Sequence, residues 1–260
     1  QFSFTAEQKL MESHKSVIGA EVVTFNRLAY RVINEIGGVI NTNLTKCGKA
    51  MLIYSILQEE KKNLKFLNKS EENIEICMRL ISELKKHGIT IEDLKREEEK
   101  IENKQNILLK NKLKDIILIF EKFENKIKNN YIDETDLLTI LAENIDKIDL
   151  LKNSDIYIDE FFGYTQQEYL IIKKIIKIAN SVTITFCTDN LELDKDAHTD
   201  IFYPNKITYK KIINLLEDKK IEIINLNNLY RFKNQELNYI KNYLYNTKIE
   251  KINTAKNIKL

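Results

Sequence analysis

The chain has 260 residues, of which 41 are basic and 39 acidic, so its formal net charge at pH 7 is only +2. A field this weak neither requires nor excludes nucleic acid, and binding to a polyanion would have to come from a local patch. No apolar run approaches the roughly 20 residues of a membrane-spanning helix, and no secretory signal is visible. We therefore expect a cytoplasmic protein with no membrane partner.

The three cysteines give no sign of a metal site or a disulfide framework. Cys47, Cys77 and Cys187 lie far apart, without a C-x-x-C pair and without matched histidine spacing. This usage is typical of a reducing compartment.

Helix signals begin almost at the first residue. Thr5 and Gln8 have the spacing of a capping box, which predicts a helix start. Residues 20–25 predict a short strand that leads into a helix over 26–36, with Thr24 as its N-cap and glycines after its end. Because the chain starts at Gln1 and ends in what reads as an unfinished strand, we expect a piece of a longer protein.

From about residue 45 to 147 every periodic segment is helical. The apolar spacing predicts helices over 71–87 and 105–129, and Asp133 is expected to cap a further one. Strand signals return at 155–159, at 182–187 and, more weakly, at 221–225. This strand–helix–strand order predicts an α/β fold with a parallel sheet and a large helical insertion.

Asp159 and Glu160 follow a predicted buried strand and precede a helix whose start carries a capping box, Thr165 with Glu168. Two adjacent acids at a strand end are typical of a nucleotidase, where they hold a Mg²⁺-bound water and orient the attacking water. Equally, such acids occur as plain helix-entry charge favoured by the N-terminal dipole.

A phosphate-binding loop is not evident. The Gly48-Lys49-Ala50 tripeptide lacks the first glycine and the hydroxyl of G-x-x-x-x-G-K-[ST], and it predicts a helix start instead. His14, His87 and His198 are isolated and read as surface or capping residues, and Cys187 reads as packing.

The segment from Thr24 to Arg31 carries two arginines and two aromatic residues at a helix N-terminus. Such a segment could hold a phosphate and stack a base. The alternative is a helix with one packed aromatic face.

An ordered series of segments runs along the chain: Gln1–Glu7, Val23–Val32, Ile81–Thr90, Asp133–Leu138, Tyr157–Glu168, Asp200–Pro204 and Tyr230–Lys233. Over essentially the whole chain the series resembles the N-terminal helicase-like region of the B subunit of the AddAB ATP-dependent helicase/deoxyribonuclease, of clostridial type. The resemblance implies a superfamily 1 helicase-like lobe of the P-loop NTPase type whose motor has decayed.

In this resemblance Asp159 and Glu160 correspond to the metal and water acids of motif II. The residues that should follow are replaced by Phe161-Phe162-Gly163, and the glutamine that senses the γ-phosphate is replaced within 187–190. The acids are therefore degenerate candidates, and we expect no catalytic residue, bound metal or cofactor in this chain. The phosphate loop would lie before Gln1, and the nuclease motif and iron–sulfur cysteines far beyond Leu260. The parent protein, an ATP-dependent helicase and exonuclease, would accordingly use ATP, Mg²⁺ and a 4Fe-4S cluster.

The resemblance also implies partners and a task. The B subunit's helicase-like half holds the 3′-terminated single strand of DNA and scans it for the Chi sequence. The A subunit drives unwinding within a heterodimer during homologous recombination and DNA repair. The positions that correspond to strand-facing residues are Gln1, Ser3, Thr24, Phe25, Arg27 and Tyr30.

Two rival functions stay open. One is a working helicase motor, once the missing phosphate loop is present; the other is a scaffold that docks the A subunit and touches no DNA. The expected division is an α/β lobe in two parts, 1–45 and 149–225, a helical insertion over 46–148, and a helical connection over 226–260 to a following domain.

Overall fold

The computed structural model describes residues 2–14, 19–38, 42–67, 73–101, 106–128, 130–159, 161–193, 200–217, 220–226 and 234–243. The chain forms two compact units, Gln1–Glu217 and Asp218–Leu260. Within the described ranges no helix combines the length and the apolar character needed to cross a membrane.

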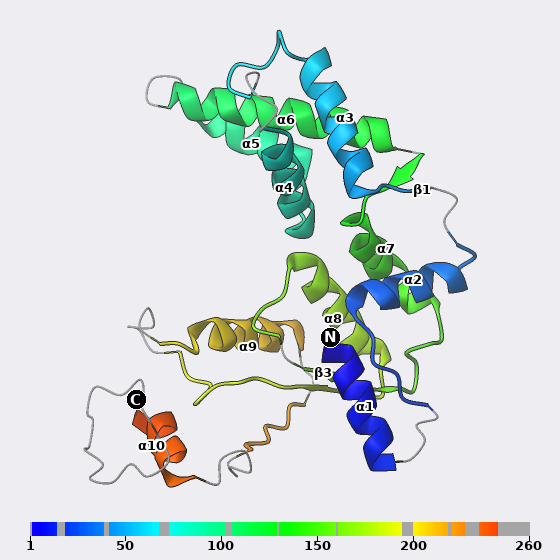
Figure 1. The fold of residues 1–260 in the computed structure, drawn as a ribbon, viewed down its shortest axis with the longest axis vertical. Coiled ribbons are helices and arrows are strands. Elements are labelled where there is room, and N and C mark those ends of the chain that lie inside the picture. Colours follow the sequence, from blue (N-terminus) through cyan, green and yellow to red (C-terminus); the bar gives the residue numbers. More distant parts are fainter. Residues whose placement is uncertain are drawn as a thin grey trace. The chain divides into compact units, whose positions relative to one another are not determined.

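The N-terminal part of the first unit contains two helices, α1 (Phe2–His14) and α2 (Phe25–Glu35) (Figure 1). Thr5 lies inside α1, so the predicted capping box at this position is wrong. Thr24 does cap α2, as predicted: its hydroxyl accepts a hydrogen bond from the backbone N–H of Arg27 at 3.2 Å. The predicted strand over 20–25 is wrong, because residues 20–24 pair with no described strand and Phe25 already belongs to α2.

Four helices pack together as the helical bundle of the first unit (Figure 1). They are α3 (Lys46–Glu59), α4 (Asn73–Lys86), α5 (Ile91–Lys100) and α6 (Ile107–Ile127). Their shared core is aliphatic around Phe123, with Ile53, Ile56 and Ile119 almost fully buried. Gly88 follows α4 at φ +67°, a left-handed conformation in which a residue with a side chain would be strained. The predicted helices over 71–87 and 105–129 are confirmed within the described residues.

Buried ion pairs connect this bundle to the segment that follows α6 in the sequence. Strand β1 (Thr42–Asn43) pairs in parallel with β2 (Tyr131–Ile132). Beside this pair the ammonium group of Lys49 contacts Asp133 at 2.6 Å and donates to Ser82 at 2.9 Å. Asp133 is predicted to cap the next helix, but Thr135 occupies the N-cap position, and the Asp133 carboxylate instead accepts from Lys49 and the Thr135 hydroxyl. A lysine from 84 residues away thus overrides the local capping tendency.

A second lysine adds to this network. Lys85 lies 2.6 Å from a carboxylate oxygen of Asp136 and 2.8 Å from one of Glu124. Burial works against the charge on Lys85, but the attraction of Asp136 and Glu124 outweighs it and leaves the pKa raised. Both ammonium groups also lie over the ring of Phe123, at 5.3 and 5.8 Å from its centroid.

The second core of the first unit is formed by helices α2, α7 (Asp136–Asn144) and α8 (Gln166–Ile178), with the short 3₁₀ helix η1 (Ile145–Lys147). Helix α8 is buried along two adjacent stripes. Ile171 and Ile175 pack into this second core, while Ile172 and Ile176 pack into a third cluster with Ile158. Helix α8 therefore links α2 and α7 to the sheet that contains Ile158.

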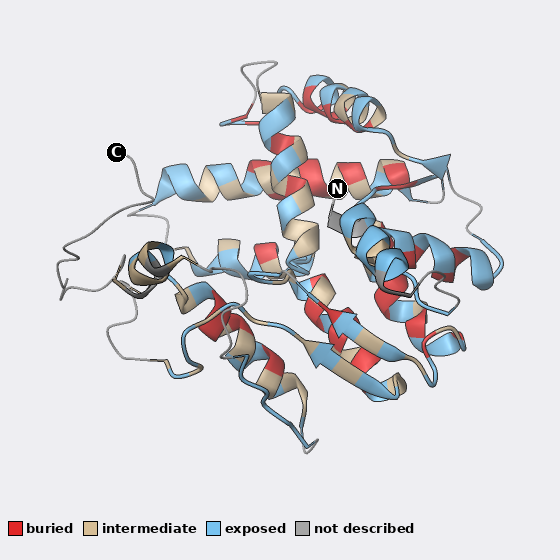
Figure 2. Cartoon of the chain, turned by 60° about the horizontal axis from the view of Figure 1, so that its bottom comes forward, coloured by how far each residue is buried: buried red, intermediate tan, exposed pale blue. Residues whose placement is uncertain are grey.

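That sheet consists of β3 (Asp155–Ile158) and β4 (Ser181–Ile184), paired in parallel from Asp155↔Ser181 to Ile158↔Ile184. One face packs toward α8 and the other carries exposed residues, so the strands are mostly in the exposed and intermediate colours of Figure 2. Both strands are shorter than predicted. Helix α9 (Tyr203–Leu215) contributes Ile212 to the cluster beneath the sheet.

The observed architecture is mostly helical α/β with two small parallel sheets among the described residues, which confirms the predicted class in its coarser form. The second unit contains α10 (Gln235–Tyr243). The predicted strand over 221–225 is wrong: residues 220–226 pair with no described strand, and their side chains are exposed. The finer division at residues 45, 148 and 225 stays a prediction.

Candidate nucleic-acid interface

Three of the residues that the sequence predicts to face single-stranded DNA lie at the start of α2. Phe25 opens the helix, Arg27 lies in its first turn and Tyr30 lies one turn further. The stripe of α2 that includes Phe25, Leu28 and Val32 packs against the second core, whereas Arg27 and Tyr30 are exposed. This amphipathic pattern fixes which side of the helix is free for a ligand.

Arg27 is exposed and held in place by acidic neighbours. Its guanidinium group donates to the carbonyl of Val22 at 3.3 Å and lies 3.8 Å from Glu7 of α1 and 4.0 Å from Glu21. Arg31 also forms an ion pair with Glu21. Because these pairs are solvent-exposed they are weak, so a phosphate could replace a carboxylate partner at little cost.

Of the remaining candidates, Tyr30 has a described side chain. Tyr30 has 43% of its surface exposed. Ser3 lies in the first turn of α1 and nothing is described of its side chain. Gln1 lies outside the described residues, and so does Glu160.

Phe25 connects α2 to the turn after β3. Its ring lies 5.7 Å from that of Phe161 in an edge-to-face arrangement, and Phe161 stacks on Tyr164 at 5.0 Å. Tyr164 in turn meets Tyr169 of α8 at 5.5 Å, and burial raises the pKa of the Tyr164 hydroxyl. Sequence reasoning did not name Phe161 or Tyr164 as site residues, although the aromatic run directly after the two acids was a usable signal.

Asp159 is exposed at the end of β3, and its carboxylate accepts a hydrogen bond from the hydroxyl of Thr185, which directly follows β4. Among the described residues no group of three or more metal-ligating side chains comes together. Asp159 therefore has a hydroxyl partner and lies two residues before Phe161. The rings of Phe25, Phe161, Tyr164 and Tyr169, which contact one another in this order, are called the aromatic row below.

Residues 187–190, where the resemblance predicts the loss of the γ-phosphate-sensing glutamine, are held by α9. The Asn205 amide donates to the carbonyl of Cys187, and the buried Lys206 lies 3.0 Å from Asp189 and 2.7 Å from Asp200. Burial alone would raise the pKa of Asp189, but the hydrogen bonds from Lys206 and from the Asn190 backbone N–H, together with the charge of Lys206, outweigh it and the pKa is lowered. The loop after β4 is therefore fixed by protein contacts.

The joint between β3 and α8 is also fixed. Thr165 and Glu168 form the predicted capping box, with both reciprocal hydrogen bonds present. Gln167 is 4% exposed and donates to the carbonyl of Thr135 at 2.9 Å and to the Thr139 hydroxyl at 2.8 Å, which ties α8 to α7.

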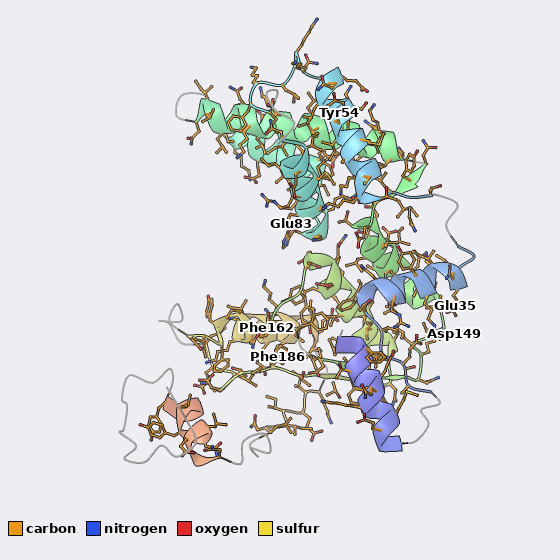
Figure 3. The ribbon with its side chains drawn as sticks, in the orientation of Figure 1. Glu35, Tyr54, Glu83, Asp149, Phe162 and Phe186 are labelled. Carbon is orange, nitrogen blue, oxygen red and sulfur yellow. The ribbon has the colours of Figure 1, made fainter. Side chains whose placement is uncertain are left out.

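Phe162 lies in this joint with its ring 73% exposed, while its backbone carbonyl accepts a hydrogen bond from Thr208 of α9. Figure 3 labels Phe162 beside α9, together with Phe186, which meets Tyr209 of that helix edge-to-face at 5.8 Å. An exposed aromatic ring on a fixed backbone offers a stacking face without the entropy cost of ordering a loop.

The other sequence candidates have structural roles. Gly48 and Lys49 lie in the first turn of α3, as predicted, with Thr45 as the cap. Cys77 is buried, which raises the pKa of its thiol to about 11, whereas Cys47 is exposed. Cys187 is also exposed, so its predicted role in packing is wrong. His87 follows α4 and lies 3.8 Å from Glu83 on the surface.

Comparison with known proteins adds an independent finding. Residues 1–241 match the family described as "ADDB, N-terminal". The chain is 37% identical over 257 residues to the B subunit of the ATP-dependent helicase/deoxyribonuclease of Clostridium botulinum strain Hall, covering 94% of the chain and 22% of that protein. It is 41% identical over 245 residues to the corresponding protein of Clostridium kluyveri, covering 90% of the chain and 21% of that protein. It is 34% identical over 256 residues to that of Acetivibrio thermocellus, with 94% and 22% covered.

The chain therefore spans about a fifth of the length of the curated relatives it matches. The match confirms the resemblance that the ordered motifs indicated, and it covers both α2 and the β3–α8 joint. The chain belongs to the AddB N-terminal family.

Proposed function

We propose that this chain is the DNA-handling, helicase-like part of the B subunit of an ATP-dependent helicase/deoxyribonuclease. It would bind the 3′-terminated single strand and scan it for a Chi-type signal, while an AddA-type subunit drives unwinding in a cytoplasmic heterodimer. The relatives' name supports the DNA substrate and an enzyme of more than one subunit. We further propose that the helical bundle is an insertion within a superfamily 1 helicase-like lobe.

One observation supports this role above the others: Phe25 of α2 packs on Phe161, two residues after Asp159. Residues 136 positions apart in the sequence thereby meet, and Arg27, Tyr30 and Phe162 are exposed. An exposed guanidinium group and exposed rings are the groups that can provide the phosphate contact and the stacking faces that single-stranded nucleic acid requires.

We infer that the nucleotide site has degenerated. Asp159 keeps the position of a metal acid, but the Thr185 hydroxyl is bonded to it and Phe161 follows it in the aromatic row. The ATP, Mg²⁺ and iron–sulfur cluster of the parent enzyme would be held by parts of the protein outside residues 1–260.

The proposal is tested by titrating labelled single-stranded DNA into the full-length protein. Arg27→Ala, Tyr30→Ala and Phe161→Ala should each weaken binding roughly five- to a hundredfold, since a stacked base contributes about 1–3 kcal/mol. Arg27→Ala should also reduce the salt slope by about 0.7, the value for one phosphate contact on a single strand.

Matched controls are available on the same chain. Tyr131 is 40% exposed, close to the 43% of Tyr30, and Arg96 is an exposed arginine in an ion pair with Asp93. Tyr131→Ala and Arg96→Ala should leave affinity unchanged. If all three test variants also bind as the wild type does, the proposed DNA path along α2 is wrong.

A working motor is a second candidate, because Asp159 remains exposed at the end of a parallel strand. Comparison of ATPase rates for the full-length protein and an Asp159→Asn, Glu160→Gln variant separates the two. A large fall in rate would favour the motor, and an equal rate supports the degenerate site.

A further inference from the structure

A cluster of lysines lies on the helical bundle, away from α2. The loop after α3 presents Lys61, Lys62 and Lys65, and Lys112 of α6 lies beside it with its ammonium group 5.5 Å from the centroid of the Phe66 ring. The three loop lysines are exposed, and so is Phe66, at 41%. These five residues are called the lysine patch below, and their loop follows α3 in Figure 1.

The loop that carries the patch is fixed from beneath. Leu64 and Leu67 are buried in the bundle core, at 2% and 5% exposure. The buried carboxylate of Asp115 accepts hydrogen bonds from three successive backbone N–H groups, those of Lys65, Phe66 and Leu67, at 2.6–3.1 Å. A buried carboxylate is thus used to hold an exposed, positively charged loop in one conformation.

The described part of the bundle provides no carboxylate partner for the lysines of the patch. No carboxylate of the described residues lies within 4.0 Å of any of the four ammonium groups of the patch. The two acids at the end of α3 are engaged elsewhere: Glu60 contacts Lys122 and Glu59 contacts Lys126, each at 2.7 Å. The hydrogen bond from Lys122 lowers the pKa of Glu60, which keeps it ionised and paired with that lysine.

We propose that the lysine patch is a second nucleic-acid contact, one that binds the phosphate backbone. Lysines neutralise phosphates as point charges without reading sequence, and the exposed Phe66 ring can lie against a sugar or a base. Helix α3 has 14 residues and so a length of roughly 20 Å, and the patch adjoins its C-terminal end, away from the β1–β2 pair at its start. The proposal rests on the proposed DNA-handling role of the parent protein and does not require the α2 surface.

The experiment uses the full-length protein and three probes: a blunt duplex, a single strand, and a duplex with a 3′ single-stranded tail. In the variant Lys61→Ala, Lys62→Ala, Lys65→Ala, Lys112→Ala, affinity for at least one probe at about 0.1 M salt should fall tenfold or more. The salt slope for that probe should decrease by about 3.6 if four duplex phosphate contacts are lost, at about 0.9 each, and by about 2.8 on a single strand, at about 0.7 each. The probe that shows the change tells whether the backbone is duplex or single-stranded.

A control variant removes the same charge elsewhere. Lys86, Lys95, Lys100 and Lys152 are exposed and each is paired with a carboxylate, so their replacement by alanine should not change the slope. An equal loss in both variants would show a non-specific charge effect and overturn the patch. Circular dichroism and thermal melting of both variants establish that each is folded.

The two proposals can fail separately. If Arg27→Ala and Tyr30→Ala bind normally while the patch variant is weakened, the α2 surface is wrong and the patch is supported. The reverse result overturns the patch alone. A photo-crosslinking amino acid at position 66 gives a direct readout: a crosslink to DNA supports the patch, whereas a crosslink to the partner subunit alone shows a protein-docking surface and overturns it.

Discussion

Charged side chains are buried in ion pairs inside the helical bundle, whereas at the β3–α8 joint a carboxylate is exposed to solvent. In the bundle Lys49 and Lys85 are buried against Asp133 and its acidic neighbours, so the charges stabilise packing between segments. At the joint the Asp159 carboxylate is exposed and is bonded to a threonine hydroxyl. An acid that directly follows a strand thus stabilises the fold in one region, as Asp133 does, and is exposed to a ligand in the other, as Asp159 is. Substitutions should accordingly cost stability in the bundle and binding at the joint.

The largest expected effect is on the bundle. Lys49→Met removes one partner of the buried pair and leaves Asp133 with an uncompensated charge, which typically costs about 3–5 kcal/mol. Hydrogen exchange of the full-length protein should show the opening free energy of the α3 and α6 amides lowered by about this amount. Adding Asp133→Leu should restore part of the loss, and unchanged protection in Lys49→Met would show that the pair does not stabilise the bundle.

A smaller effect is expected from the carboxylate under the patch loop. Asp115→Ala removes the acceptor of three backbone N–H groups, of which only that of Leu67 is in a buried bond; water can bond to the other two, so the cost is about 1–3 kcal/mol. Amide exchange should accelerate at Lys65, Phe66 and Leu67 and much less in α6. Asp115→Asn keeps one acceptor oxygen and should be intermediate; equally fast exchange in both would argue that the loop is held by its leucines alone.

The helices could be predicted because their signals are local. The 3.6-residue period of α6 and the Thr24 and Thr165 caps all act within a few residues. Strands need a partner, and the predicted strands at 20–25 and 221–225 have no described partner, so their β-forming residues alone did not produce a sheet.

The site was harder to predict because its contacts are long-range. The sequence indicated Arg27 and Tyr30 through the family resemblance, but the Phe25–Phe161 contact joins segments 136 residues apart. The role of Asp133 was mistaken for the same reason, since its partner Lys49 is 84 residues away. No local pattern carries such pairings.

The capping box at the start of α8 allows an intermediate comparison. Thr165→Ala should lower local stability by about 1 kcal/mol, the usual value for a lost N-cap. The loss should be confined to the first turn of α8 and measurable as faster amide exchange at Glu168, whose N–H bonds to the Thr165 hydroxyl. A change that extended into the bundle would mean that the two regions are less independent than their contacts indicate.

The smallest effect on stability is expected at Thr185. Thr185→Val removes the hydroxyl that donates to Asp159, and because the acceptor is exposed, water should replace it at a cost of at most about 1 kcal/mol. The thermal melting temperature of the protein should be nearly unchanged. A large fall would place Asp159 among the structural acids, together with Asp133 and Asp115.

The hydrogen bonds of Gln167 bear on how the parent enzyme would be regulated. Its amide holds α8 to α7 directly behind the joint, while Thr208 and Asn205 hold the flanking segments. A surface whose shape is maintained by such internal contacts needs no nucleotide to become ordered. By thermodynamic linkage, a ligand that does not alter the populations of a site's conformations cannot alter its affinity. If the chain binds single-stranded DNA as proposed, that binding would not depend on nucleotide, and any ATP-dependent change in DNA binding would arise in the proposed partner motor.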